Sequence, residues 1–428
     1  MDDVRVIRPF AGAVDATVLP PGSKSITNRA LLAAALADGT SVLRGALIAD
    51  DTEAMIDCVR SLGATVEQSV EDTTLTVTGI AGDLSGADRR FFARQSGTTA
   101  RFLVPVLALG DLERTLDADP AMRRRPMGAS FDALAHLGIR VESSDGSLPV
   151  AITGPVRNDG ARPTIEVDGS VSSQFTSGLL LAARCFPNGL EVKMVGEVVS
   201  RPYLEMTVDV MRAFGAEVTV SGTTFAVAAG GYRAVDFRIE PDASAASYFF
   251  AIAAICGGTV RIEGLGSRSL QGDVHFVDVL AEMGADVTIE DNAITVRGAP
   301  LHGVTADFSQ ISDTAQTIAA VAVFASSPTT ITGIDFIRRK ETDRISAVVN
   351  ELQRLGIDAR EDDDGFTVIP GPTRAAVVET YDDHRMAMSM MLIGLAREGI
   401  SIADPDCVRK TFPTYFDAIE ELRPGGPA

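Results

Sequence analysis

Amphipathic segments that end in a glycine recur along this chain at a nearly constant interval. The first places Met55, Val59 and Leu62 at helical spacing before its glycine, and a strand pattern follows. Glycine there is typical of a helix C-cap, because it adopts left-handed backbone conformations without steric cost. The glycines are spaced by 75, 77, 69 and 72 residues: Gly63, Gly138, Gly215, Gly284 and Gly356. The chain is therefore predicted to repeat a unit of about 70 residues.

A second series of segments alternates with the first. These segments are rich in alanine and leucine, apolar on all sides, and open on a small polar or acidic residue. Helices of this kind must be buried. Their predicted starts are Ser25, Ser96, Ser172, Asp242, Ser312 and Asp382. Each repeat then contains one buried helix, one half-exposed helix and several strands, and six repeats of this size are predicted to form two domains of three.

Two short proline-containing stretches suggest where the chain crosses between these domains. Pro20, Pro21 and Gly22 end the first strand pattern, and Pro241 precedes the fourth apolar helix. The prediction is that residues 22–239 form one domain, while residues 1–21 and 240–428 form the other.

Charge and composition narrow the function class. The formal net charge is −20 and the isoelectric point is about 4.6, opposite to what a nucleic-acid or membrane-surface binder needs. Clusters of cations in such a chain suggest capture of a small anion, although any one cluster could be ordinary surface charge.

Four cysteines without paired spacing argue against disulfides and zinc. The start of the sequence has no secretory pattern. We expect a soluble cytoplasmic protein.

Residues 21–29, PGSKSITNR, lie between a strand pattern and the first apolar segment. A Pro-Gly break is followed by serines that can cap a helix, with Lys24 and Arg29 near the positive end of the helix dipole. Such a helix start attracts phosphate and carboxylate groups. If three buried helices per domain run parallel, their starts converge, and two converging surfaces would form a cleft between the domains.

Other helix starts carry more polar groups than a cap needs. Ser172, Ser173 and Gln174 form one such run, and a lone carboxylate, Asp313, is interpreted either as an N-cap or as a general base. Lys340 and Arg344 are expected to share one face of a helix start. The four histidines show no metal-binding spacing, and P-loop and nucleophile-elbow patterns are absent from the sequence.

Taken together, these motifs resemble the EPSP synthase (3-phosphoshikimate 1-carboxyvinyltransferase) family of enolpyruvyl transferases. The resemblance runs from about Pro9 to Phe416. The matching stretches are residues 21–29, 96–98, 125–126, 168–175, 200–203, 242–244, 340–344, 383–388 and 410–413.

The resemblance implies an α/β (α+β) fold of two inside-out α/β barrels, each with three βαβαββ-like repeats around buried parallel helices, and an active site in the interdomain cleft. It also implies transfer of the enolpyruvyl (carboxyvinyl) group of phosphoenolpyruvate to the 5-hydroxyl of shikimate 3-phosphate, through a tetrahedral intermediate and with release of phosphate. This reaction belongs to the shikimate pathway to chorismate and the aromatic amino acids, and it is the target of glyphosate. No metal or organic cofactor is implied, and a monomer is expected.

The resemblance also implies residue roles. Asp313 would accept the proton of the attacking hydroxyl and Glu341 would protonate the methylene carbon, with Lys24 as a third catalytic group. Shikimate 3-phosphate would be bound by Lys24, Ser25, Arg29, Ser172, Ser173, Gln174, Ser200, Tyr203, Asp313 and Lys340. Phosphoenolpyruvate would be bound by Lys24, Gly97, Arg125, Gln174, Arg344, Arg385 and Lys410.

The sequence departs from the family pattern at three positions. Gln95 stands where the family often has Asn, Phe102 where many members have Pro, and Phe336 where some members have a substrate-contacting Asn. The substrate contacts near these positions and the response to glyphosate therefore stay open.

Two alternative functions remain. A UDP-N-acetylglucosamine enolpyruvyl transferase would carry a reactive Cys in the loop at residues 119–126, which lacks one. A non-catalytic binder of phosphorylated metabolites would not need Asp313 and Glu341.

Overall fold

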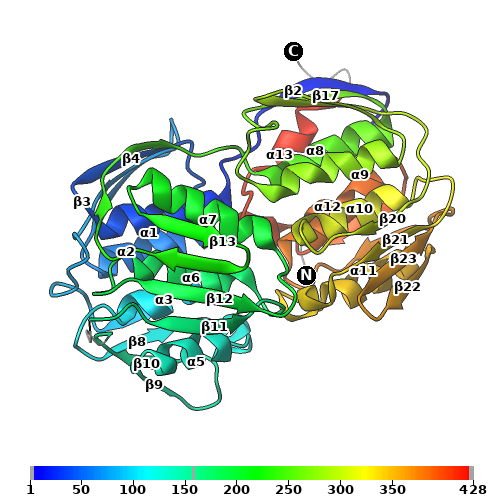
Figure 1. Ribbon diagram of the computed structural model, residues 1–428. Coiled ribbons are helices and arrows are strands. Elements are labelled where there is room, and N and C mark those ends of the chain that lie inside the picture. The colour runs from blue at the N-terminus through cyan, green and yellow to red at the C-terminus, as the bar shows by residue number, and fades with distance from the viewer. Residues whose placement is uncertain (1–3, 157–159, 424–428) are drawn as a thin grey trace. The chain divides into compact units, whose positions relative to one another are not determined.

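The computed structural model describes residues 4–156 and 160–423 (Figure 1). Its contacts divide the chain into two units. The inserted unit is Gly22–Glu240, and the split unit combines the chain up to Pro21 with the chain from Pro241 onward. Residues 1–3 and 424–428 of the second predicted domain lie outside the described residues.

The inserted unit contains three four-stranded sheets with one pairing pattern, in which two parallel strands are followed by two antiparallel ones. The first sheet is β16 (Asp236–Arg238), β4 (Thr40–Arg44), β6 (Thr74–Thr78) and β5 (Thr65–Ser69). The second is β7 (Arg90–Phe92), β8 (Arg114–Asp117), β10 (Val150–Thr153) and β9 (Arg140–Ser143). The third is β11 (Thr164–Asp168), β12 (Leu190–Val195), β14 (Thr224–Val227) and β13 (Val218–Ser221). A short pair joins β3 (Ala37–Asp38) to β15 (Tyr232–Arg233).

The split unit repeats this pattern twice and then varies it. Its first sheet is β2 (Val14–Val18), β17 (Gly258–Glu263), β19 (Ala293–Arg297) and β18 (Asp286–Ile289). Its second is β20 (Thr305–Asp307), β21 (Thr329–Thr332), β23 (Gly365–Ile369) and β22 (Asp358–Asp362). Within the described residues, its third consists of β24 (Ala376–Val378), β25 (Ile400–Ala403) and β1 (Val4–Val6). In this last sheet, a strand from the start of the chain replaces the hairpin.

The six predicted apolar helices are present and buried. In the inserted unit they are α1 (Lys24–Leu36), α3 (Gly97–Leu107) and α6 (Ser173–Ala183). In the split unit they are α8 (Ala243–Cys256), α10 (Ala315–Ala322) and α12 (His384–Gly394). The three helices of each unit pack against one another and against the sheets of that unit. In the inserted unit, α3 and α6 approach so closely that a Cβ on Gly178 would lie 2.5 Å from the carbonyl oxygen of Arg101.

The glycine-terminated helices are also confirmed. They are α2 (Asp50–Ser61), α5 (Gly128–His136), α7 (Arg201–Ala213), α9 (Phe276–Glu282) and α11 (Arg344–Arg354). A further helix, α13 (Tyr415–Glu420), lies near the end of the described chain. The predicted capping glycines all have positive φ, from 77° at Gly138 to 113° at Gly284. The order strand, buried helix, strand, amphipathic helix and hairpin is the predicted βαβαββ repeat. An example is β7–α3–β8–α5–β9–β10, in which a one-turn helix, α4 (Pro120–Arg123), precedes α5.

The first sheet of each unit pairs two strands that lie far apart in the sequence but belong to the same unit. β2 pairs in parallel with β17, although the whole inserted unit separates them in sequence. β16, at the end of the inserted unit, pairs in parallel with β4 near its beginning. The helices that follow these two strands along the chain, α1 and α8, belong to the other unit in each case.

Candidate active site

Asp313, a predicted catalytic residue in the split unit, is surrounded by cations. Its Oδ1 accepts a hydrogen bond from Lys340 Nζ at 2.6 Å, and its Oδ2 accepts one from Arg385 Nη2 at 2.7 Å. Arg385 Nη1 also donates to the Asp313 backbone carbonyl at 2.9 Å. Arg344 Nη1 approaches Oδ1 at 3.4 Å. Three side chains predicted to bind substrates therefore hold the predicted base in place.

Glu341, the predicted acid, belongs to the same network. Its Oε2 accepts a hydrogen bond from Arg344 Nη2 at 2.8 Å, and its Oε1 accepts one from Lys410 Nζ at 3.0 Å. Arg344 thus contacts both predicted proton-transfer groups. Charge-assisted hydrogen bonds of this kind are short and directional, so they fix the carboxylates where chemistry would use them.

Asp383 completes the network and was not among the predicted site residues. It is fully buried, and its carboxylate accepts from Arg344 Nε at 2.8 Å and from Nη2 at 3.2 Å. The same carboxylate caps α12 by accepting from the Arg385 backbone N–H. The sequence signal that could have identified Asp383 is the pair of acidic residues, Asp382 and Asp383, at the start of this apolar helix. Burial alone would lower the pKa of Arg344, but Asp383, Glu341 and Asp313 together raise it above its ordinary value.

One local prediction about this region was wrong, and one of the two interpretations of Asp313 is excluded. Lys340 and Arg344 do not share a helix start, because Lys340 ends a 3-10 helix, η3 (Asp335–Arg339), and α11 begins only at Arg344. Asp343 sets that boundary by accepting from the backbone N–H groups of Ile345 and Ser346, both at 3.1 Å. Asp313 does not cap α10, since it lies in a separate 3-10 turn, η2 (Ser312–Thr314), and uses its carboxylate on side chains instead.

The network carries a small positive excess. Its four cations, Lys340, Arg344, Arg385 and Lys410, face three carboxylates, which leaves one net positive charge if all are ionised. Burial is the main cause that lowers the pKa of Lys340, with Asp313 opposing it. A site of this charge is suited to receive an anion, because the cations already lie on neighbouring elements.

In the inserted unit, Arg29 is buried and linked to three helices. Its Nε donates to Thr207 Oγ1 at 2.7 Å, and its Nη2 donates to the Tyr203 carbonyl at 3.2 Å and to Ser177 Oγ at 3.3 Å. Its Nη1 donates to the carbonyl of Ser25 at 2.8 Å. Burial lowers the pKa of Arg29 to about 10. Arg29 therefore ties the start of α1 to Tyr203 and the first turns of α7.

A second cluster of the inserted unit lies where α3 and α6 begin. Gln174 Oε1 accepts from Arg101 Nη1 at 2.5 Å, and Gln174 Nε2 donates to Thr98 Oγ1 at 3.4 Å. Gly97 is packed so closely that a Cβ there would lie 2.8 Å from Arg125 Nη1. Arg101 was missed by sequence analysis, although it lies four residues after Gly97 and so on the same helical face.

The remaining predicted residues of this unit lie at helix starts. Lys24 is the first residue of α1 and pairs with the buried carboxylate of Asp51 at 3.5 Å. Ser23 rather than Ser25 caps that helix. Ser172 caps α6, with Ser173 as its first residue, and Ser200 precedes α7 in a left-handed conformation with φ of 53°. These predicted residues of the inserted unit therefore lie at the starts of α1, α6 and α7.

A buried carboxyl near Asp313 predicts a pH effect on stability. Burial, reinforced by the negative charge of Asp313, raises the pKa of Asp273 to about 6, even though Ser244 donates a hydrogen bond to it. Between pH values of about 4 and about 6, the folded protein then holds a proton that the unfolded chain has released. We therefore expect Asp273 to make stability fall as pH rises through this window. Denaturation curves at several pH values should show this slope in the wild type and lose it in Asp273→Asn.

The matched control is Asp278→Asn, which removes an exposed carboxylate near the start of α9. The control should keep the wild-type slope. An Asp273→Asn protein with the wild-type slope would contradict the assignment.

In the described part of the chain, no group of three or more His, Cys, Asp or Glu side chains is placed to hold a metal ion. Within those same residues, none of the helices combines the length and the apolar character needed to span a membrane.

Comparison with known proteins identifies the class of fold. Over 98% of this chain and 98% of the other, the structure resembles an EPSP synthase from Acinetobacter baumannii, with a TM-score of 0.84 and 25% sequence identity. It also resembles the enolpyruvyl transferase NikO from Streptomyces tendae, with a TM-score of 0.75, 20% identity and coverage of 98% and 97%. The architecture is therefore that of the enolpyruvyl transferases.

Sequence comparison is more specific. The model of the EPSP synthase (3-phosphoshikimate 1-carboxyvinyltransferase) family matches residues 10–419. A 3-phosphoshikimate 1-carboxyvinyltransferase of Trichormus variabilis is 42% identical over 94% of this chain and 95% of its own length. A 3-phosphoshikimate 1-carboxyvinyltransferase of Aliivibrio fischeri is 40% identical over 96% of this chain and 97% of its own length. The chain belongs to the EPSP synthase family.

Proposed function

We propose that this protein transfers the enolpyruvyl group of phosphoenolpyruvate to the 5-hydroxyl of shikimate 3-phosphate and releases phosphate, as a step of the shikimate pathway. The observation that carries the proposal is the placement of Asp313 and Glu341 on either side of Arg344, with 3.4 Å and 2.8 Å contacts. An acid and a base that share one arginine can serve two proton transfers in a single cycle.

In this mechanism, the substrates supply the anions that the network lacks. Each phosphate carries about −1.5 to −2 charges near neutral pH, by analogy with phosphoserine. Arg344, Arg385 and Lys410 would bind phosphoenolpyruvate, and Lys340 would bind shikimate 3-phosphate. Arginine suits both phosphate and carboxylate because its planar fork donates two parallel hydrogen bonds.

The chemical step then follows from these positions. Glu341 protonates the methylene carbon of phosphoenolpyruvate, which leaves positive character on the neighbouring carbon. Asp313 accepts the proton of the attacking 5-hydroxyl, and a tetrahedral intermediate forms. Loss of phosphate and of a proton from the methyl group yields the product. Lys340 and Arg385 stay within hydrogen-bonding reach of Asp313, so they can stabilise its ionised form.

The inserted unit would contribute the remaining contacts. We assign Ser25, Arg29, Ser172, Ser173, Ser200 and Tyr203 to shikimate 3-phosphate, Gly97 and Arg125 to phosphoenolpyruvate, and Lys24 and Gln174 to both. The proposal requires that the two groups of residues face a common space when both substrates are bound. Arg29 already uses its donors on Ser25, Ser177, Tyr203 and Thr207, so it would also act by positioning Tyr203.

The proposal extends to the state and location of the enzyme. The four cysteines, Cys58, Cys185, Cys256 and Cys407, are all free thiols, which is typical of a reducing compartment. We therefore place the enzyme in the cytoplasm, and we propose that it acts as a monomer without a cofactor.

One assay tests the function. Phosphate release should require phosphoenolpyruvate and shikimate 3-phosphate together. UDP-N-acetylglucosamine as acceptor should give none, because the loop at residues 119–126 offers no cysteine. Release with the nucleotide sugar instead would favour the alternative transferase. Tight binding of both substrates without any phosphate release would favour a non-catalytic binder.

A further inference from the structure

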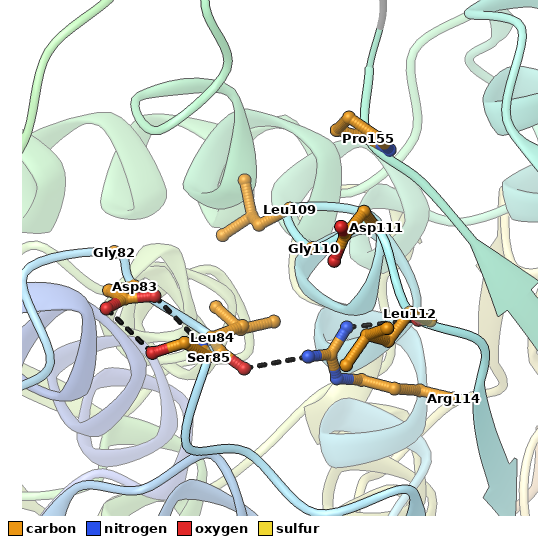
Figure 2. Close-up of a pocket in the computed structure, with 10 residues that line it drawn as sticks. All are labelled: Gly82, Asp83, Leu84, Ser85, Leu109, Gly110, Asp111, Leu112, Arg114 and Pro155. Atoms are coloured by element: carbon orange, nitrogen blue, oxygen red, sulfur yellow. Dashed lines mark hydrogen bonds between the residues drawn. The ribbon is translucent and has the colours of Figure 1, made fainter.

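The inserted unit contains a cavity of about 290 Å³ that none of the predicted site residues lines (Figure 2). It is formed by the loop after β6, at residues 82–85, and by the loop from α3 to β8, at residues 109–112. Arg114 and Pro155 complete its lining. This volume lies just below the range of roughly 300–1,000 Å³ for sites of drug-sized ligands, so an occupant must be small.

Arg114 is a buried cation with few partners. Its side chain is 1% exposed, and within the described residues it donates only to the carbonyl oxygens of Leu84, at 2.7 Å, and Leu112, at 3.1 Å. A guanidinium has five N–H donors, and Nε of Arg114 is buried without a partner in the part of the chain that the structure describes. No carboxylate among those residues pairs with it. Burial is the main cause that lowers the pKa of Arg114; the neighbouring Arg89 adds to the effect, and the negative charge of Asp111 opposes it.

The absence of a side chain at Gly110 leaves the space that the Arg114 guanidinium occupies. A Cβ on Gly110 would lie 2.5 Å from Nη1 of Arg114 and 3.1 Å from its Cζ. The planar group therefore lies directly against the Gly110 backbone at the cavity. A buried cation that forms no ion pair is unfavourable, and the negative charge of Asp111 offsets only part of this cost, so this arrangement suits an anionic group as a partner.

A carboxylate lines the same cavity without pairing with Arg114. Asp111 is exposed, and its side chain makes no hydrogen bond or ion pair with any residue that the structure describes. Asp83, the other acid of the lining, is already engaged, because Ser85 donates to it from its backbone N–H at 2.8 Å and from its hydroxyl at 2.9 Å. Among the described residues, the cavity thus presents a positive and a negative side chain that form no ion pair with each other or with a third residue.

We propose that this cavity binds a zwitterionic α-amino acid with an aliphatic side chain. Its carboxylate would bind Arg114, and its ammonium group would bind Asp111. Its side chain would pack on the apolar part of the lining, which Leu84, Leu109, Leu112 and Pro155 provide. A simple phosphate ion fits less well, because Asp83 and Asp111 would repel it.

The test is binding of L-leucine to the full chain, which titration calorimetry or ligand-detected NMR measures. We expect saturable binding with a dissociation constant of ~1 mM or below. Isocaproate lacks the ammonium group and isoamylamine lacks the carboxylate, so each should bind at least about 10-fold more weakly, as expected for loss of a charged hydrogen bond. Inorganic phosphate should not displace leucine.

Three variants locate the ligand. Asp111→Asn should weaken leucine at least about 10-fold but leave isocaproate unchanged, because only the ammonium contact is lost. Gly110→Ala should weaken leucine and isocaproate together, because the new methyl group displaces the guanidinium. Glu113→Gln is the control, since it removes a negative charge from the same loop outside the cavity lining and should bind leucine normally.

The proposal is overturned if leucine shows no saturable binding, if phosphate competes with it, or if both Asp111→Asn and Gly110→Ala bind leucine like the wild type. Because the readout is binding alone, none of these outcomes bears on the proposed transferase activity.

Discussion

Replacing Asp313 by Asn should lower kcat by about 10²–10⁴-fold, the usual contribution of a positioned general base. Asn keeps the size of the side chain but cannot accept the proton of the attacking hydroxyl. The KM for phosphoenolpyruvate should stay constant or fall. In the wild type, Lys340 and Arg385 donate hydrogen bonds to Asp313 at 2.6 Å and 2.7 Å. In the variant, the neutral Asn no longer offsets their positive charges, so these charges can attract the anionic substrate. Steady-state phosphate release measures both constants.

The control for this experiment is Asp335→Asn. Asp335 is an exposed carboxylate of the same unit and also pairs with arginines, Arg338 and Arg339. Its loss should leave kcat unchanged. Wild-type turnover in Asp313→Asn would remove Asp313 as the base, and a rise in KM without loss of kcat would make it a binding residue only.

Replacing Asp383 by Ala should lower the free energy of unfolding by about 3–5 kcal/mol, the usual cost of removing one partner from a buried ion pair. Arg344 is 2% exposed and Asp383 is fully buried, so water cannot replace the lost hydrogen bonds. The variant also loses the cap of α12. Chemical denaturation followed by circular dichroism measures the change.

Asp358→Ala provides the matched comparison. Asp358 also pairs with an arginine, Arg360, at 2.8 Å, but the two side chains are 54% and 65% exposed. Exposed pairs contribute about 1 kcal/mol or less. Equal losses of stability in the two variants would show that burial of the Asp383–Arg344 pair is not what makes it important.

The helices were predictable because their signals are local. Each buried helix is apolar on every face, and five of the six begin at a side-chain cap, on Ser23, Ser96, Ser172, Asp242 or Asp383. The glycine ends were equally local, because positive φ at these positions excludes most other residues.

The candidate site was less predictable because its contacts are distant in sequence. Asp383 meets Arg344 across 39 residues, and Arg101 meets Gln174 across 73. Helical periodicity carries no information about such pairs. The wrong helix start at Lys340 has a different cause. Charge spacing alone favoured a helix there, but Asp343 captures the first N–H groups and delays the start to Arg344.

The parallel pairing of β2 with β17, which flank the inserted unit in the sequence, has a consequence for how the chain folds during synthesis. The inserted unit is one continuous segment, and its two ends are joined by a 2.8 Å hydrogen bond from Ser23 N–H to the Glu240 carbonyl. It can fold once Glu240 has left the ribosome. The split unit must instead wait for β17 before β2 gains its partner. Prior folding of the inserted unit brings Pro21 and Asp242 to hydrogen-bonding distance, 2.8 Å, and so removes most of the loop-closure entropy. We therefore expect an obligatory order, in which the middle of the chain acquires structure before its two ends.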